Sequence, residues 1–165
     1  LQIDFVTELF TLAKEKGVNT CLDTSGNPFT REEPFYSKFE KLMEVTDLFM
    51  LDIKEIDEDE HKKLTGQTNK NILDMATCLS DHGKAMWIRH VLVPGITDDD
   101  GQLHRLRAFI DTLKTVERVE ILPYHTLGVF KWKELGIPYA LEDVEPPTKE
   151  QVEHAREIII PGYKS

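Results

Sequence analysis

The sequence predicts an α/β protein with about four parallel strands and flanking helices. Four apolar, partly β-branched runs recur at similar intervals, near residues 18–24, 47–54, 86–93 and 118–125. Helical patterns separate these runs, and strands that alternate with helices of this length are typical of βαβ units in a parallel sheet. A closed barrel of such units normally has eight strands in about 250 residues, so four strands predict an open sheet or a piece of a partial barrel.

The predicted helices follow from apolar residues at spacings of three and four. They cover residues 1–16, 34–46, 69–82, 100–115 and 149–160. The first helix places four apolar residues on one face, Phe5, Leu9, Leu12 and Ala13. Gly17 is the stop signal for this helix.

Polar residues mark where further helices begin. Thr148 and Gln151 have the spacing of a capping box at the start of the last helix. The acidic run from Glu55 to Glu60 predicts a solvated helix start, because carboxylates favour a helix amino terminus. Asp98-Asp99-Asp100 predicts another start, with Thr97 or Asp98 as its cap. Four histidines in or near the helical patterns are expected at the surface: His61, His82, His104 and His154.

Length and composition exclude several classes of protein. The 165 residues are enough for a single domain, 1–165, that buries roughly 70% of its unfolded surface. A formal net charge of −10 argues against a nucleic-acid binder and against docking to an anionic membrane, since both need clustered Lys and Arg. No apolar run approaches the ~20 residues of a membrane span, and no signal peptide opens the chain. Cys21 and Cys78 lie far apart without a metal-type spacing, so a cytoplasmic location is expected.

Charged and polar side chains collect where the predicted strands end. They are Asp23, Thr24, Asp52, Lys54, Arg89 and His125. In parallel α/β folds, ligands bind at the edge of the sheet formed by the carboxyl ends of the strands. Right-handed crossovers bring all four strand ends to that edge. Because all four strands end in charged or polar residues, the sequence predicts one ligand-binding cavity at this edge.

Side-chain parity refines this prediction, because successive side chains of a strand point to opposite faces. Five residues are expected to face the cavity: Asp23, Asp52, Lys54, Arg89 and His125. His125 is included because it falls in line with Val119 and Ile121. This choice leaves Glu120 on the opposite face with no role.

Each residue alone has a structural alternative, since Asp23 can mark a turn and Asp52 can form a structural ion pair with Lys54. Arg89 in mid-strand is harder to explain this way, because a buried guanidinium needs an anionic partner. Together, the lysine and arginine suit a carboxylate, and the two aspartates suit an ammonium, a ribose hydroxyl or a small cation. A zwitterionic ligand similar to an amino acid satisfies both halves. The sequence contains no phosphate-binding glycine loop, HExxH pair or nucleophilic serine elbow.

Four segments resemble successive strand ends of the glycyl-radical-enzyme activases, which belong to the radical S-adenosylmethionine superfamily. They are DTSG at 23–26, MLDIK at 50–54, RHVLVPGITDDD at 89–100 and LPYH at 122–125. The resemblance continues through residues 127–139 and covers nearly the whole chain in order. It implies the last four strands of a splayed, TIM-like partial (β/α)6 barrel.

The resemblance also implies an activity. In such enzymes a [4Fe–4S] cluster reductively cleaves S-adenosylmethionine, and the 5′-deoxyadenosyl radical takes a hydrogen atom from a glycine of a partner glycyl-radical enzyme. Flavodoxin or ferredoxin is the implied electron donor. Residue by residue, Lys54 and His125 would contact the nucleoside, and Arg89 would help to hold the ligand. The amino-acid end would be surrounded by Asp23, Thr24, Asp52 and the Met50 carbonyl, which are also the implied ligands of a monovalent cation.

The chain departs from the family pattern in one respect. It contains neither the CxxxCxxC loop that holds the cluster nor the Gly-Gly-Glu segment that binds the methionyl amino group. Cys21 and Cys78 have the wrong spacing to replace them, and the chain opens on a helix at Leu1 without an initiator Met. We therefore expect a carboxyl-terminal fragment that is inactive by itself and binds no cofactor tightly. The open sheet edge left by missing strands predicts self-association.

Two other functions stay open. Lys54 at a strand end beside Asp52 could form a Schiff base, as in an aldolase-like (β/α) barrel lyase. The chain could also be a non-catalytic module that binds a partner protein through its acidic surface.

Overall fold

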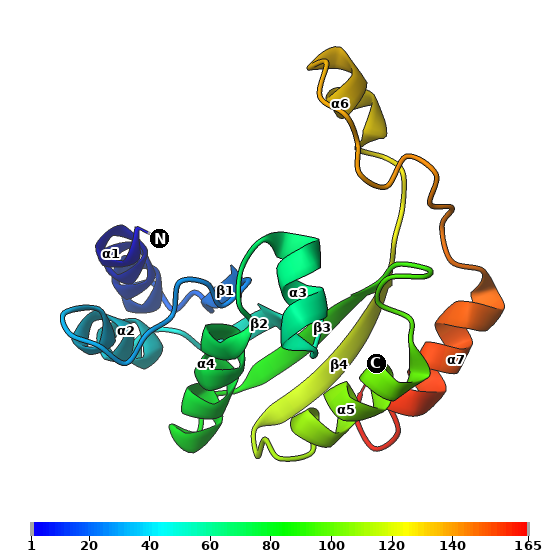
Figure 1. Ribbon diagram of the computed structural model, residues 1–165. Coiled ribbons are helices and arrows are strands. Elements are labelled where there is room, and N and C mark those ends of the chain that lie inside the picture. Colours follow the sequence, from blue (N-terminus) through cyan, green and yellow to red (C-terminus); the bar gives the residue numbers. More distant parts are fainter. Residues whose placement is uncertain (1, 165) are drawn as a thin grey trace.

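The computed structural model describes residues 2–164, which form one parallel sheet with helices packed on it (Figure 1). The strands are β1 (Cys21–Thr24), β2 (Leu48–Asp52), β3 (Met86–Leu92) and β4 (Val116–Pro123). They lie side by side in the order β1-β2-β3-β4, and each neighbouring pair is parallel. The prediction of four parallel strands is confirmed, and β1 and β4 are the edge strands of this sheet.

Seven helices lie within the described residues. They are α1 (Ile3–Glu15), α2 (Phe35–Glu44), α3 (Glu58–Thr65), α4 (Lys70–Asp81), α5 (Asp100–Ile110), α6 (Val129–Glu134) and α7 (Lys149–Ile159). The five helices predicted from apolar spacing are all present. α5 ends earlier than the predicted residue 115, because the Thr115 carbonyl already accepts a hydrogen bond from the Met86 amide at the start of β3 (3.1 Å).

The core lies on one side of the sheet only. Side chains on β2 and β3 alternate between buried and half-exposed along each strand. The buried set, which includes Phe49, Leu51 and Ile88, packs with apolar residues of α2, α4, α5 and α7 in one cluster. The other face of the sheet keeps its side chains half-exposed, as expected for the inner face of a partial barrel.

α1 does not pack with the face that apolar spacing suggested. Phe5, Leu9 and Leu12 are exposed, whereas Ile3 is buried and Phe10 packs against the core. Spacing correctly identified a helix, but this helix also carries apolar residues on its solvent side. α1 packs beside α2 (Figure 1), and this position decides which of its apolar faces is buried.

Of the helix caps predicted from the sequence for α5 and α7, one is confirmed and one was wrong. The Thr148–Gln151 capping box at α7 is confirmed. The cap of α5 is Asp99, whose carboxylate accepts from the Gln102 amide (2.9 Å), so the choice of Thr97 or Asp98 was wrong. Thr97 is instead buried in the preceding loop, where its hydroxyl donates to the Val91 carbonyl (2.7 Å).

Two predictions for the region of α3 were wrong. Its cap is Asp57, and Glu55 is 2% exposed, so the acidic run is not wholly solvated. His61 was expected at the surface but is also 2% exposed, because α3 turns it inward, where Nδ1 lies 2.9 Å from the Gln67 carbonyl oxygen. His82, His104 and His154 are exposed as expected.

Residues between β4 and α7 form an arm that carries α6 away from the sheet (Figure 1). Its base is fixed by the hydroxyl groups of Tyr124 and Tyr139, which lie 2.9 Å apart. This hydrogen bond raises the pKa of Tyr124 to about 12, so the contact persists at neutral pH. Trp132 packs against the Tyr139 ring, with centroids 5.4 Å apart.

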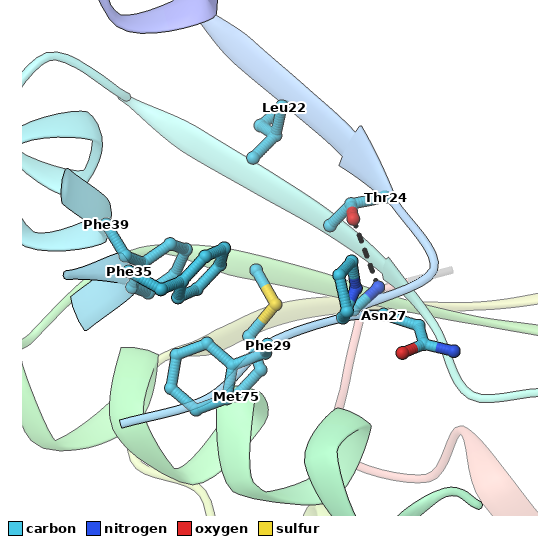
Figure 2. A pocket seen from close by; sticks show the side chains of 9 residues that line it. Leu22, Thr24, Asn27, Phe29, Phe35, Phe39 and Met75 are labelled. Atoms are coloured by element: carbon cyan, nitrogen blue, oxygen red, sulfur yellow. Dashed lines mark hydrogen bonds between the residues drawn. The ribbon is translucent and has the colours of Figure 1, made fainter. Parts of the chain in front are cut away.

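The loop after β1 is held from below by aromatic side chains (Figure 2). Phe29 contacts Phe39 edge-on, with ring centroids 5.1 Å apart, and both are buried. Above them, the Gly26 amide donates to the Thr24 hydroxyl (3.0 Å) and the Phe29 amide donates to the Gly26 carbonyl (3.0 Å). These contacts fix where the chain leaves β1.

Gly26 is the residue of this loop that tolerates no side chain. Its φ is +74°, and an added Cβ would lie 3.0 Å from Leu51 Cδ1 and 3.2 Å from Ile72 Cα. We expect Gly26→Ala to lower the free energy of unfolding in urea by about 2–4 kcal/mol, from backbone strain plus overpacking. Gly17 is the control, because its φ is +71° with no atom within 4 Å of an added Cβ. Gly17→Ala should cost about 1–2 kcal/mol, and equal losses at the two positions would contradict a packing role for Gly26.

Candidate ligand-binding site

The polar strand ends predicted from the sequence lie on the half-exposed face of the sheet. Strand register aligns Asp23 with Met50, and Met50 with Trp87. Two residues further toward the carboxyl ends, Asp52 is aligned with Arg89. Side chains at aligned positions of neighbouring strands point to the same face. The register therefore brings groups from β1, β2 and β3 together.

The centre of the site is an ion-pair network around Arg89. Arg89 Nε donates to Asp52 Oδ1 (2.9 Å), and its terminal nitrogen NH2 lies 2.8 Å from the same oxygen. NH2 also pairs with Asp23 Oδ1. Lys54 Nζ reaches the second oxygen of Asp52 at 3.2 Å. Four of the predicted residues thus form one connected cluster at the carboxyl edge, which we call the Arg89 cluster.

Burial differs within the Arg89 cluster. The side chains of Arg89 and Asp52 are 16% and 19% exposed, whereas those of Lys54 and Asp23 are 37% and 56% exposed. Desolvation acts to lower the pKa of Arg89, but the hydrogen bond to Asp23 and the charges of Asp52 and Asp23 outweigh it and raise the pKa. The guanidinium is therefore a fixed positive charge. The more exposed Asp23 and Lys54 are the members most accessible to a ligand.

Three other predicted residues lie outside the ion-pair network. Thr24 uses its hydroxyl to accept from the Gly26 amide, which fixes the turn after β1. Met50 lies between Asp23 and Trp87 in the register. His125 is exposed and lies two residues beyond Pro123, the last residue of β4.

The parity argument for β4 was wrong. Val119 and Ile121 are 0% and 4% exposed on the helix-covered side, whereas Glu120 is aligned with Arg89 on the half-exposed face. Parity could not be carried from these residues to His125, because β4 ends at Pro123 and the backbone no longer alternates beyond it. A correct assignment of the two faces of β4 would have placed Glu120 on the same face of the sheet as Arg89.

A second group missed from the sequence extends the polar face on β4. Arg118 lies over the Trp87 ring, 4.8 Å from its centroid, and its Nε lies 3.2 Å from Glu120 Oε1. Trp87 therefore packs on the half-exposed face of the sheet and not in the core. A guanidinium over an indole face is a cation–π contact, which favours this arrangement of the two side chains.

A cavity of about 130 Å³ opens beside Lys54, between the loop after β1 and α3. Its polar lining includes Asn27 and His61, and His61 Nε2 has no hydrogen-bond partner among the described residues. Since Nδ1 faces the Gln67 carbonyl, the neutral ring presents Nε2 as an acceptor. Sequence reasoning missed this cavity because it placed His61 at the surface.

The two cysteines lie in different environments. Cys21 is exposed on β1, and Cys78 is buried on α4, where its Sγ lies 3.8 Å from the Tyr36 hydroxyl. Desolvation and then the charge of Asp23 raise the pKa of the Cys21 thiol. Within residues 2–164, no group of three or more His, Cys, Asp or Glu side chains is placed to hold a metal ion.

A parallel sheet with a charged, half-exposed carboxyl edge has the architecture in which α/β proteins commonly bind small polar ligands. The sequence profile of the Radical SAM superfamily matches residues 1–106, and the chain belongs to that superfamily.

Two bacterial proteins that are more than half identical to this chain have the same name. The chain is 57% identical over 159 residues to the pyruvate formate-lyase-activating enzyme of Streptococcus mutans serotype c, covering 96% of this chain and 60% of the relative. It is 51% identical over 159 residues to the enzyme of the same name from Listeria monocytogenes serovar 1/2a, covering 96% and 64%. The chain thus spans less than two thirds of the length of these relatives.

Solved structures share this fold, and one of them covers nearly the whole chain. It is a domain of pyruvate-formate lyase-activating enzyme from Bacteroides vulgatus, with a TM-score of 0.79 at 19% identity, covering 99% of this chain and 89% of that one. The similarity confirms the predicted partial-barrel class of fold. Among the described residues, no helix is both long and apolar enough to cross a membrane.

The unequal burial of the two aspartates predicts unequal effects on stability. Asp52→Asn leaves Arg89 and Lys54 without a carboxylate between them, so we expect a loss of about 1–3 kcal/mol in urea unfolding, less than for a fully buried pair. Asp23→Asn is the matched control, because its exposed carboxylate should contribute less than about 1 kcal/mol. A larger loss for Asp23→Asn than for Asp52→Asn would contradict Asp52 as the centre of the network.

Proposed function

We propose that this chain is the carboxyl-terminal, ligand-binding part of an activase that reductively cleaves S-adenosylmethionine and generates a glycyl radical on pyruvate formate-lyase. The proposal is supported by relatives of that name at 51–57% identity over 96% of the chain. The structural observation that carries it is the Arg89 cluster. Two cations and two carboxylates at one sheet edge suit a zwitterionic ligand that also bears ribose hydroxyls.

Each side chain has a stated task in this proposal. Lys54 and Arg89 donate hydrogen bonds to the ligand, with Lys54 and the exposed His125 nearest to the nucleoside. Asp23, Thr24, Asp52 and the Met50 carbonyl surround the amino-acid end, and the same oxygens are the candidate ligands of a monovalent cation. Because both aspartates pair with Arg89, a cation or an ammonium group would bind by sharing these carboxylates with the guanidinium.

The iron–sulfur cluster that the family implies does not fit the donors of this chain. A [4Fe–4S] cluster is held by cysteine thiolates, normally four, or three with one iron left open. The sequence contains Cys21 and Cys78 only, one exposed on β1 and one buried on α4. We therefore assign cluster binding to residues outside this sequence in the whole protein. The residues present bind and orient the ligand.

The proposal also covers the cellular location and the electron donor of the whole protein. It would act as a cytoplasmic enzyme that receives electrons from flavodoxin or ferredoxin, with residues 1–165 as one domain of it. The net charge of −10 supports neither nucleic-acid nor anionic-membrane binding.

A Schiff-base lyase using Lys54 is less well supported. An amine nucleophile must lose its proton, and enzymes achieve this by desolvation or a neighbouring cation. Lys54 instead pairs with the Asp52 carboxylate at 3.2 Å and is 37% exposed, so it does not lie in a desolvated pocket. The geometry is that of a binding residue.

The activity is tested on the full-length gene product. Incubated anaerobically with a reductant, S-adenosylmethionine and pyruvate formate-lyase, it should produce a glycyl radical signal in electron paramagnetic resonance. Lys54→Met should lower the rate at least about tenfold, because a charge-assisted contact to the ligand is lost. Lys84→Met, on the loop before β3, is the control and should leave the rate unchanged. The 165-residue chain alone should bind no cluster after reconstitution with iron and sulfide, and a stoichiometric cluster on it would refute the proposed division.

We also propose that the free edge of β1 promotes self-association of the isolated chain. β1 pairs only with β2 in the described sheet, so its outer amide and carbonyl groups are available to another strand. The isolated chain should show a concentration-dependent mass in light scattering. A substitution with Pro at the exposed Cys21 should reduce the association, and a monodisperse monomer at high concentration would contradict the proposal.

A further inference from the structure

A second cavity lies beside the Arg89 cluster, between α3, the loop after β3 and the arm. It has a volume of about 230 Å³. Its apolar wall is made by Leu64, Ile96, Ala140 and Leu141, and its charged lining by Glu55, Glu60 and Lys63. Glu55 follows Lys54 directly in the sequence, so the cavity and the cluster share one sheet edge.

Glu55 gives this cavity its chemistry. The residue is 2% exposed, and one carboxylate oxygen, Oε1, accepts a hydrogen bond from the Asp57 amide (2.9 Å). The other oxygen, Oε2, is buried and has no hydrogen-bond partner among the described residues. A buried carboxylate oxygen without a donor is strongly unfavourable, so a group that brings a donor into the cavity gains a large part of that energy.

Glu55 is held in place independently of any ligand. The Asn69 side-chain amide, itself buried, donates to the Glu55 carbonyl (3.1 Å) and to the Ile56 carbonyl (2.8 Å). Asp57, the cap of α3, pairs with Arg105 on α5 at 3.1 Å. The backbone that carries Glu55 is therefore fixed, and the carboxylate can leave its position only by giving up the hydrogen bond from the Asp57 amide.

The other charged groups of the cavity do not neutralise Glu55. Lys63 Nζ is committed to Glu60 Oε1 at 2.7 Å, and both side chains are far more exposed than Glu55. Beyond Leu141, the arm continues with Glu142 and Asp143, which add negative charge nearby in the sequence. The chain as a whole has a net charge of −10. The cavity is thus an apolar slot with an unpaired carboxylate oxygen in an acidic setting.

We infer that this cavity binds a lysine or arginine side chain of the protein partner. The aliphatic stem of such a side chain fits the apolar wall, and its terminal N–H groups supply the donor that Glu55 Oε2 lacks. A metal ion is a poorer occupant, because it needs several oxygen ligands and Glu60 is already paired. The inference rests on the proposed function for the identity of the partner, pyruvate formate-lyase. It adds an anchoring contact one residue away from the ligand-binding Lys54.

The cavity can be tested on the isolated chain with a small cation of the same shape. Titration with n-butylammonium chloride should shift the methyl resonances of Leu64, Ile96 and Leu141 in a methyl-labelled sample. n-Butanol has the same stem without the charge and should bind at least about tenfold more weakly. Equal binding of the two probes, or shifts confined to other methyl groups, would overturn the inference.

Three variants separate recognition from folding. Glu55→Gln keeps an oxygen that accepts from the Asp57 amide but removes the charge, and it should weaken n-butylammonium binding at least about tenfold. Glu40→Gln makes the same change on the exposed side of α2 and should bind like the parent chain. If Glu55→Gln does not fold, Ala140→Phe fills the cavity from the exposed arm and should abolish the methyl shifts. Unchanged binding in that variant would equally refute the site.

The partner is tested in the full-length protein. Glu55→Gln should raise the KM for pyruvate formate-lyase about tenfold, with kcat unchanged, because the contact is remote from the reacting atoms. An unchanged KM, with an active parent protein, would refute the anchoring role and leave the proposed function intact. An inactive parent protein would refute the proposed function, while the amine titration would still decide whether the cavity binds a cation.

Discussion

The ion pairs of Arg89 hold together the charged carboxyl edge of the sheet, on which the candidate site depends. The guanidinium lies on β3 and reaches Asp52 on β2 and Asp23 on β1. An arginine that is 16% exposed requires this compensation, because an unpaired charge at such burial is unfavourable. The pairing therefore specifies strand register and side-chain direction at the carboxyl edge. Lys54, which joins through Asp52, obtains its position from the same network.

The two faces of the sheet have different surroundings. Along β2 and β3, one residue enters the helix-covered core and the next faces the half-exposed side. Mutations of Phe49 or Ile88 would act on packing, whereas mutations of Arg89 or Asp52 would act on an ion pair of the half-exposed face. The turn after β1 connects the two faces, since Phe29 anchors it in the core and Gly26 allows the close approach to Leu51.

The two consecutive residues Lys54 and Glu55, just after β2, lie at two different surfaces. Lys54 joins the Arg89 cluster, and Glu55 turns into the cavity beside α3. On the proposed function, ligand and protein partner would therefore contact adjacent residues of one rigid segment. Asn69 and the Asp57–Arg105 pair keep that segment fixed, so neither contact requires a mobile loop.

The sequence by itself determined the four parallel strands, the five main helices, the capping box at Thr148 and the collection of charged residues at strand ends. These features depend on local periodicity and on residues near one another in the chain. Tertiary structure alone decided that His61 and Glu55 are buried, that Glu120 shares a face with Arg89 and that α6 projects on an arm. The physical reason is that these outcomes depend on which element covers which surface, and on where β4 ends, and neither is encoded in local spacing.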